Sequence, residues 1–286
     1  MAEFSLPESR ADFERELDAF VEEHRFTIAV VFPVLGAILL TASAEALLGP
    51  LSFNPWLIVS GTLVMRLPLI AGVLPEIGRR AAVALGLLTG YAYGIEYLGV
   101  KTGWPYGFFE YGVDLGPMLL DTVPVGLPIF FFPLVVNAYL LCLLLLGTRA
   151  ESAPIRLLSV IALVLVIDFV LDPGAVALGF WAYEGGGAYY GVPWSNYQGW
   201  VLSATVAVLA LDWGFSRAGL RARLDRCRFM LDDLVSFVIL WGSINAYFGN
   251  WIPVALAALI GVGLWRTERF DIPMPPWLAR RRAVRS

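Results

Sequence analysis

The chain has 286 residues, of which 58% are hydrophobic and 15% are charged, and its mean hydropathy is +0.72. Soluble domains are typically about 45–50% apolar and about 25% charged. A chain this apolar cannot form a water-compatible surface, so the composition excludes a soluble enzyme, a disordered chain and a small disulfide-stapled domain. The formal net charge of −4 gives no indication of nucleic-acid binding. We expect an all-α, multi-pass protein of the cell membrane.

The amino-terminal segment, residues 1–25, is predicted to form an amphipathic helix on the membrane surface. Its apolar residues recur at helical spacing from Phe13 to Val21, with charged residues between them, which is typical of an interfacial helix. We expect residues 26–270 to form a single transmembrane helical domain, and residues 271–286 to form a basic cytoplasmic tail.

Long apolar stretches predict about eight transmembrane helices. A spanning helix needs about 20 largely apolar residues. The last two stretches are short and are separated only by Gly249 and Asn250, so seven spans or one re-entrant pair stay open as alternatives. The predicted spans are 26–48, 55–74, 80–99, 124–147, 155–179, 199–215, 233–249 and 250–266.

The arginines predict the orientation of these spans. With eight crossings, eighteen of the twenty basic residues fall on one side of the membrane, in the two termini and in the connections that follow even-numbered spans. Of the other two, Lys101 lies on the opposite side and Arg66 lies within the second span. Cytoplasmic loops are enriched in basic residues, so we expect both termini in the cytoplasm.

Two carboxylates in the fifth span form the strongest candidate site. Asp168 and Asp172 are four residues apart, so they share one face of the helix. Pro173 and Gly174 follow directly and are expected to break or kink the helix, turning backbone groups toward a cavity. Ionisable groups inside a membrane are costly and mark functional sites by default. Two neighbouring carboxyls supply one acid and one base, which suits proton transfer on an apolar substrate.

Other polar and aromatic residues gather around the same side of the membrane. Glu96 ends the third span, and Asp114 lies in the loop that follows it. Arg66 either holds one of these carboxylates charged or makes a purely structural ion pair. Most of the many aromatic residues are expected in the interfacial belt, while a few line a pocket and stabilise a carbocation or stack along a polyene.

Several familiar sites are missing from the sequence. No predicted span contains a lysine, which excludes a retinal Schiff base, and His24 is the sole histidine, which argues against haem, zinc and histidine-rich di-iron sites. The chain has no dinucleotide-binding or P-loop motif. We therefore expect neither a metal nor a cofactor. Gly90 and Gly94 predict a close helix contact, most simply inside the bundle.

Three blocks of the sequence resemble the carotenoid hydratase family of integral membrane proteins. The family pattern is an acid-led Gly-Pro-Gly block, an Asp-x-x-x-Asp-Pro helix and a Pro-x-Ser-Asn-Tyr-x-Gly-Trp turn. The chain departs from it at Ile167, where an aromatic residue often stands. The matching blocks are EYLGVKTGWPYGFFEYGVDLGP (96–117), DFVLDPGAVALGFW (168–181) and YYGVPWSNYQGW (189–200).

The resemblance implies an enzyme that adds water to the terminal carbon–carbon double bonds of a C50 carotenoid, giving tertiary alcohols without a redox cofactor. A carboxyl group would protonate the less substituted alkene carbon, and water would add to the resulting tertiary carbocation. The expected partners are the carotenoid, water, the lipid bilayer and other membrane enzymes of the same pathway. The candidate catalytic residues are Asp168, Asp172, Glu96, Asp114 and Asn196. The candidate substrate-binding residues are Tyr93, Tyr97, Trp104, Tyr111, Trp181, Tyr197 and Trp200.

The sequence alone leaves two other functional hypotheses open. The first is a membrane prenyltransferase that uses the Asp168-x-x-x-Asp172 motif with a metal ion, which strict metal dependence would favour. The second is a non-enzymatic carotenoid-binding scaffold whose buried acids are structural. Unchanged product after substitution of both aspartates would favour the scaffold.

Overall fold

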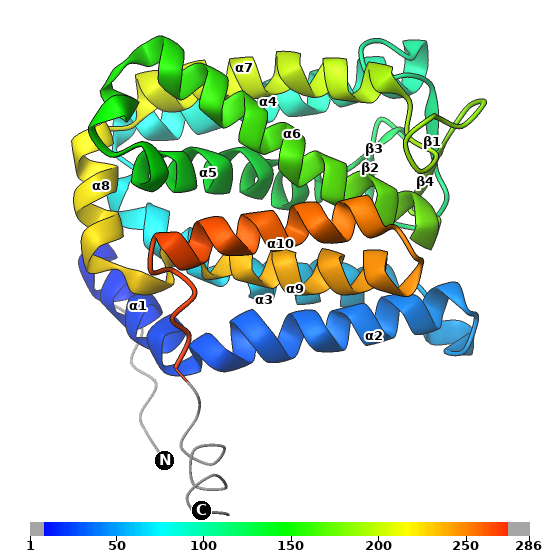
Figure 1. The fold of residues 1–286 in the computed structure, drawn as a ribbon, viewed down its shortest axis with the longest axis horizontal. Coiled ribbons are helices and arrows are strands. Elements are labelled where there is room, and N and C mark those ends of the chain that lie inside the picture. The colour runs from blue at the N-terminus through cyan, green and yellow to red at the C-terminus, as the bar shows by residue number, and fades with distance from the viewer. Residues whose placement is uncertain (1–8, 274–286) are drawn as a thin grey trace, which may run out of the picture.

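In the computed structural model, which describes residues 9–273, the chain runs back and forth along one axis as a bundle of helices (Figure 1). The all-α expectation is confirmed, since the strands are only two or three residues long and lie in connections. The helices are α1 (Arg10–Phe26), α2 (Phe32–Ala44), α3 (Pro55–Val73), α4 (Arg79–Thr102), α5 (Leu127–Leu146), α6 (Ala153–Leu178), α7 (Trp194–Gly214), α8 (Arg217–Arg226), α9 (Asp232–Tyr247) and α10 (Trp251–Arg266). The strands are β1 (Phe109–Tyr111), β2 (Met118–Leu119), β3 (Val123–Pro124) and β4 (Trp181–Tyr183).

Six helical segments in the described part of the chain are long and apolar enough to cross a membrane, and a seventh is added if the bent pair α7–α8 counts as one span. The two helices of that pair meet at 89°. Helix α10 has 16 residues, or about 24 Å at 1.5 Å per residue, which is shorter than the roughly 30 Å of a hydrocarbon core. The chain is therefore a helical protein with six to seven candidate spans.

Helices α1 and α2 form one continuous helical segment, Arg10–Ala44, joined by a π-helical turn at Thr27–Val31. The helix does not end at residue 25, where the sequence interpretation placed the end of a surface helix. No glycine or proline lies between Arg10 and Phe32 to stop it. Val21 and Arg25 of α1 are buried in the bundle. The predicted basic tail lies mostly outside the described residues, which end at Ile272 and Pro273.

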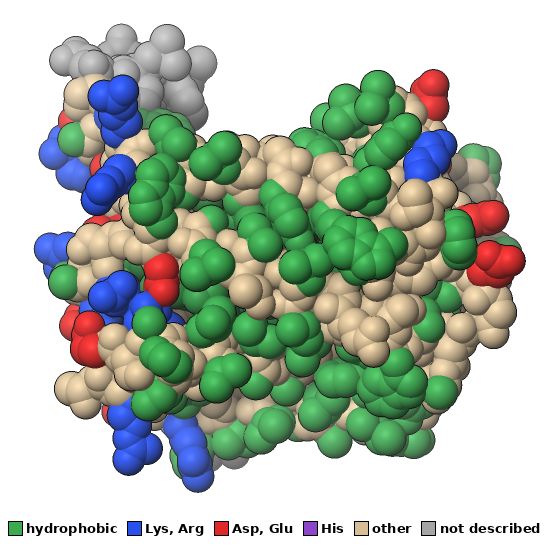
Figure 2. Space-filling model, turned by 90° about the horizontal axis from the view of Figure 1, so that it is seen from above, with side chains coloured by type: hydrophobic (Ala, Val, Ile, Leu, Met, Phe, Trp, Pro, Cys, Tyr) green, Lys and Arg blue, Asp and Glu red, His purple; other side chains and the backbone are tan. Residues whose placement is uncertain are grey.

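The two ends of the bundle differ in charge. Most of the arginines gather at the end where α1 and α8 lie, while the middle of the visible face is poor in charge (Figure 2). We call this end the arginine end. The opposite end, which we call the hairpin end, carries the four short strands and the connections on either side of them (Figure 1). The described chain begins and ends at the arginine end.

Two small antiparallel ribbons close the hairpin end. Strand β1 pairs with β4, so that Phe109 lies opposite Tyr183 and Tyr111 lies opposite Trp181. Strand β2 pairs with β3 across the turn at Leu120 and Asp121 to form the β2–β3 hairpin. The first ribbon joins segments about seventy residues apart in the sequence, and so connects α4 with α6.

The sequence predicts that Pro173 breaks or kinks the helix, and the break is wrong, because α6 continues through Pro173 to Leu178. Proline has no N–H to donate to the carbonyl oxygen four residues earlier, which belongs to Phe169. The hydroxyl of Tyr189 donates a hydrogen bond to that oxygen at 3.3 Å. An external donor thus satisfies the backbone, and the helix is not interrupted.

Two buried asparagines support the same turn of α6. The Nδ2 of Asn245 donates to the carbonyl oxygen of Val170 at 2.8 Å, and the Nδ2 of Asn250 donates to that of Pro173 at 3.3 Å. Asn250 also donates to Oδ1 of Asn245 at 3.0 Å. The connection between α9 and α10 therefore fixes the part of α6 that carries the aspartate pair.

Gly90 and Gly94 do not make the internal contact expected from the sequence. Both glycines are exposed on α4, and a Cβ atom added at either would meet nothing within 4 Å in the described part of the chain. That interpretation is wrong because the buried face of α4, which includes Ala92, is on another side of the helix.

Three buried ion pairs lie between the middle of the bundle and the arginine end. Each joins helices that are distant in sequence, and their aspartates come from α7 and α9. The pairs are Arg25 with Asp232 (Nε to Oδ2, 2.8 Å), Arg156 with Asp212 (Nε to Oδ1, 2.8 Å) and Arg66 with Asp233. Arg66 makes a structural pair and does not contact the aspartates of α6.

We expect Arg66→Leu to lower the free energy of unfolding by about 3–5 kcal/mol, because it leaves the fully buried Asp233 carboxylate without its cation. The double variant Arg66→Leu/Asp233→Leu should recover most of this loss, since an apolar replacement of a buried pair is often neutral. Thermal unfolding of the purified protein in detergent measures both. Arg15→Leu, which removes an exposed pair with Asp12, is the control and should cost under about 1 kcal/mol. Equal loss in the single and double variants would contradict the expectation.

Candidate active site

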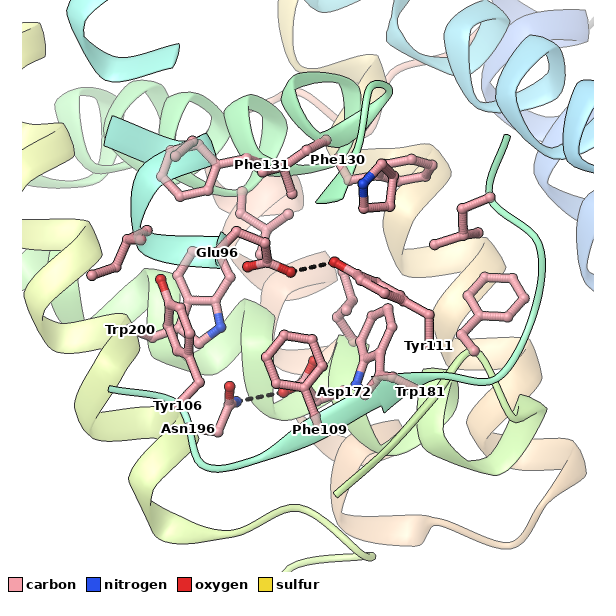
Figure 3. A pocket seen from close by; sticks show the side chains of 18 of the residues that line it. Glu96, Tyr106, Phe109, Tyr111, Phe130, Phe131, Asp172, Trp181, Asn196 and Trp200 are labelled. Carbon is pink, nitrogen blue, oxygen red and sulfur yellow. Dashed lines mark hydrogen bonds between the residues drawn. The ribbon is translucent and has the colours of Figure 1, made fainter. Parts of the chain in front are cut away.

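A cavity of about 140 Å³ lies at the hairpin end, enclosed by α4, α5, α6 and α7 and by strands β1 and β4 (Figure 3). One water needs about 10–15 Å³ of such space, so the cavity can take water together with an apolar group. Its wall is mostly aromatic and aliphatic. Three side chains, Glu96, Asp172 and Asn196, add carboxyl and amide groups.

The aspartate pair of α6 is held by one amide. The Nδ2 of Asn196, in the first turn of α7, donates to Oδ2 of Asp168 at 3.0 Å and also to Oδ2 of Asp172. The expectation that the two aspartates share one helix face is confirmed. Asp172 lines the cavity, while Asp168 lies one turn earlier and is fully buried. The Oδ1 of Asp168 has no hydrogen-bond partner within residues 9–273.

Tyr183 completes the environment of Asp172. Its hydroxyl donates to Oδ2 of Asp172 at 3.2 Å from strand β4. Burial, with the neighbouring carboxylates of Asp172 and Asp168, raises the pKa of Tyr183 well above its usual value. The hydroxyl therefore keeps its proton and acts as a neutral donor.

A third carboxyl group faces this pair from the other side of the cavity. Glu96 of α4 lies opposite Asp172, with aromatic rings between them (Figure 3). The hydroxyl of Tyr111, on β1, donates a hydrogen bond to Oε1 of Glu96. Burial and the Glu96 carboxylate raise the pKa of Tyr111, so this hydroxyl is also a neutral donor.

Aromatic rings form most of the remaining wall. Phe131 stacks on Trp200 with ring centroids 5.7 Å apart. Tyr106 is fixed by a 2.6 Å hydrogen bond between its hydroxyl and that of Ser203. The indole Nε1 of Trp181 is buried, and within residues 9–273 it has no hydrogen-bond partner.

Of the residues expected from sequence, seven belong to this cavity or contact it directly. Six line it, and Asp168 joins them through Asn196. The six are Glu96, Tyr111, Asp172, Trp181, Asn196 and Trp200.

The other expected residues lie elsewhere. Asp114 is exposed, and its Oδ1 accepts a 2.8 Å hydrogen bond from the backbone N–H of Gly116, so it stabilises its own loop. The hydroxyl of Tyr93 donates to the carbonyl oxygen of Val125 at 2.6 Å. Tyr97 lies on the surface beside Lys101.

Two aromatic residues of the expected binding set are also outside the cavity. Trp104 is exposed and lines a separate surface cleft beside Phe108. Tyr197 is buried against Phe169, with ring centroids 4.1 Å apart. Tyr197 contributes to packing at the hairpin end, and in the described part of the chain neither side chain hydrogen-bonds a carboxyl group.

Strand alternation reveals two cavity residues that the sequence analysis did not select, Phe109 and Tyr183. Side chains of a strand alternate between its faces, and Phe109, Tyr111, Trp181 and Tyr183 occupy alternate positions of the β1–β4 ribbon and all line the cavity. Glu110, between two of them, is exposed. The alternation was visible in the sequence, but the pairing of the two strands was not.

The arrangement does not fit the metal site of a prenyltransferase. In residues 9–273, no three histidine, cysteine, aspartate or glutamate side chains gather in a way that could hold a metal ion. The groups closest to the aspartate pair are hydrogen-bond donors, the amide of Asn196 and the hydroxyl of Tyr183. Both are neutral groups that donate to the carboxylate oxygens.

Comparisons with known proteins give the family of the chain. Residues 53–264, which include every carboxyl group of the cavity, match the family described as "Carotenoid biosynthesis protein". The chain is 63% identical over 275 residues to a protein of Haloarcula japonica named bisanhydrobacterioruberin hydratase, covering 96% of this chain and 94% of that relative. No solved structure matches. The chain therefore belongs to the carotenoid biosynthesis protein family.

Proposed function

We propose that this protein is a carotenoid hydratase, which converts bisanhydrobacterioruberin to bacterioruberin by adding water to its terminal double bonds. The similarity to the Haloarcula japonica hydratase over almost the whole of both chains supports this activity and this substrate. The reaction is a hydration, which moves protons and water but no electrons, and the cavity offers groups for both.

One observation carries the proposal. None of the ion pairs formed within residues 9–273 involves Glu96, Asp168 or Asp172, and all three accept hydrogen bonds only from neutral amide or hydroxyl groups. A carboxylate paired with arginine is held in its charged form. Carboxyl groups with neutral partners in a shared apolar cavity can instead take up and release protons, which general acid–base catalysis requires.

The proposed first step is protonation of the alkene. Asp172 faces the cavity and donates its proton to the less substituted carbon of a terminal double bond, leaving a tertiary carbocation on the neighbouring carbon. The Asp172 carboxylate left behind is stabilised by the hydrogen bonds that it accepts from Tyr183 and from Asn196, whose Nδ2 also donates to Asp168. Two close carboxyls that hold one proton between them are the arrangement known from carboxylate dyads.

Water then adds from the opposite wall. Glu96, oriented by Tyr111, binds the water molecule and accepts its proton as the oxygen bonds to the cation. The π faces of Trp181 and Trp200 stabilise the positive charge during this step. Transfer of the proton from Glu96 back to the aspartate pair through cavity water restores the starting state, so one water is consumed for each double bond.

We further propose eight crossings of the cell membrane, with both termini in the cytoplasm and residues 26–270 as the transmembrane domain. The back-and-forth course of the chain and the charge difference between the two ends support this topology (Figures 1 and 2). It puts the cavity near the outer surface. In this arrangement α9 and α10, which pack side by side, are two short spans. Other carotenoid-pathway enzymes of the membrane are the expected protein partners.

Substitution of the cavity carboxyls tests the chemistry. We expect Asp172→Asn and Glu96→Gln each to lower hydration by at least about 100-fold, because each removes a proton donor or acceptor. The measurement is the mass of pigments extracted from a host that accumulates bisanhydrobacterioruberin. Asp114→Asn, in the exposed loop, is the matched control and should retain activity. Full activity of either cavity variant, with the protein present in normal amount, would refute the assigned roles.

The position of the cavity predicts the order of products. All three carboxyl groups lie at one end of the bundle, whereas the carotenoid has two similar ends, so each end must bind in turn. We expect a singly hydrated intermediate, one water heavier than the substrate, to appear before the doubly hydrated product in a time course followed by mass spectrometry. Only substrate and doubly hydrated product at every time point would contradict this order.

A further inference from the structure

The size of the cavity raises the question of where the rest of the substrate lies. A cavity of about 140 Å³ accepts the end of a C50 chain but not its length. The polyene must therefore leave the cavity through an opening into an apolar medium, and the bilayer is that medium for a membrane protein.

One side of the bundle is suited to such an opening. Helix α4 packs extensively against α7, but only sparsely against α5 and at most marginally against α3. The cavity wall on this side comes from Leu115 and Pro124, at the base of the β2–β3 hairpin, and from Leu127 and Phe130, in the first turn of α5. All four are apolar, and the last two are only half-buried.

The β2–β3 hairpin covers the gap between α3 and α4. On the α4 side, the hydroxyl of Tyr93 donates to the carbonyl oxygen of Val125 at 2.6 Å. On the α3 side, Gly116 lies beside Pro55 and Gly126 lies beside Val59. The hairpin and the residues at its base thus contact both helices and cover the first turn of α5.

The outer surface of this hairpin is unsuited to water. Met118, Leu119, Leu120 and Val125 are exposed, Leu120 by 70%. Between residues 115 and 126 the sole charged residue is Asp121. Exposed apolar groups this closely spaced mark a contact with protein or lipid, and here they continue directly into the apolar wall of the cavity.

The other cleft at the hairpin end is closed toward the cavity. It lies between α4 and α7 and is lined by Trp104 and Leu202. Tyr106, which is 5% exposed, separates it from the cavity and is held by Ser203 at 2.6 Å. Gly199 packs so closely on the Tyr106 ring that a Cβ atom would lie 2.3 Å from it.

We infer that the carotenoid reaches the carboxyl groups laterally from the bilayer, through a portal between α3 and α4 beneath the β2–β3 hairpin, and that the hairpin lies in lipid. The portal depends on the proposed function, because that function supplies the carotenoid substrate. The position of the hairpin in lipid does not depend on it and is tested separately.

Fluorescence tests the position of the hairpin. The native cysteines, Cys142 and Cys227, are both buried, so a polarity-sensitive thiol label on Leu120→Cys reports the hairpin tip in phospholipid vesicles. We expect blue-shifted emission and strong quenching by a lipid-borne quencher. The same label on Glu184→Cys, in the exposed loop after β4, should report water. Water-like emission from residue 120 would overturn the inference whatever the enzyme's activity.

A plug in the gap tests the portal. Val59→Trp fills the space beside the hairpin at a residue that does not itself line the cavity. We expect it to slow hydration of the C50 carotenoid by at least about tenfold, since access steps can limit turnover. Hydration of 2-methyl-2-heptene, a short alkene with the same end group, should change by less than about twofold. Leu202→Trp, in the closed cleft, is the matched control and should affect neither substrate.

Each other outcome decides against the portal. Equal loss of both substrates in Val59→Trp would overturn the portal, because residue 59 would then affect the end group and not the passage of the long chain, and no loss would mean that the carotenoid passes elsewhere. Selective loss of the carotenoid in Leu202→Trp would move the route to the α4–α7 cleft. If the unsubstituted protein hydrates neither substrate, the proposed function fails, and the portal fails with it.

Discussion

The cost of an ionisable group inside a bilayer organises this structure. Such a group needs a partner, and the chain supplies partners of two kinds. Asp212, Asp232 and Asp233 are each paired with an arginine toward the arginine end. Glu96 and Asp172, at the hairpin end, accept hydrogen bonds only from neutral groups. The first kind ties helices together, and the second leaves carboxyl groups that can exchange protons. Carboxyl groups thus stabilise one end of the bundle and, in the proposed mechanism, carry out the chemistry at the other.

At the hairpin end, α6 depends on hydrogen bonds that side chains from other segments donate to its backbone. A proline directly after Asp172 removes a backbone hydrogen bond, and Tyr189 and Asn245 supply donors to the nearby carbonyl oxygens. Gly174 leaves room for Trp241, whose ring would lie 2.9 Å from an added Cβ atom. Because Trp241 also lines the cavity, this turn of α6 fixes both the carboxyl pair and part of the apolar wall.

The sequence predicted features that depend on neighbouring residues and missed contacts between residues that are far apart in the chain. Helix bounds follow apolar stretches, and the shared face of Asp168 and Asp172 follows from their spacing, so both were accessible. The partner of Arg66 is 167 residues away, and nothing in the sequence relates the two. The role of Asp114 was misplaced for another reason, which is local. The motif match identified Asp114 by its place in the sequence. In the structure, the loop turns the Asp114 side chain toward the backbone N–H of Gly116.

The polarity of the product explains why the site suits the edge of the bundle. Hydration turns an apolar chain end into a tertiary alcohol, and an alcohol buried without a hydrogen-bond partner costs roughly 2–7 kcal/mol. The cavity offers partners only near Glu96 and the aspartate pair, while its wall toward α5 is apolar. A hydrated end is therefore less well accommodated by that wall than an unhydrated one. In the proposed topology the polar boundary of the bilayer lies close by and can solvate its hydroxyl. A site deep in the bundle would hold the product, and a site at this depth favours its release and leaves the second end of the same carotenoid free to bind.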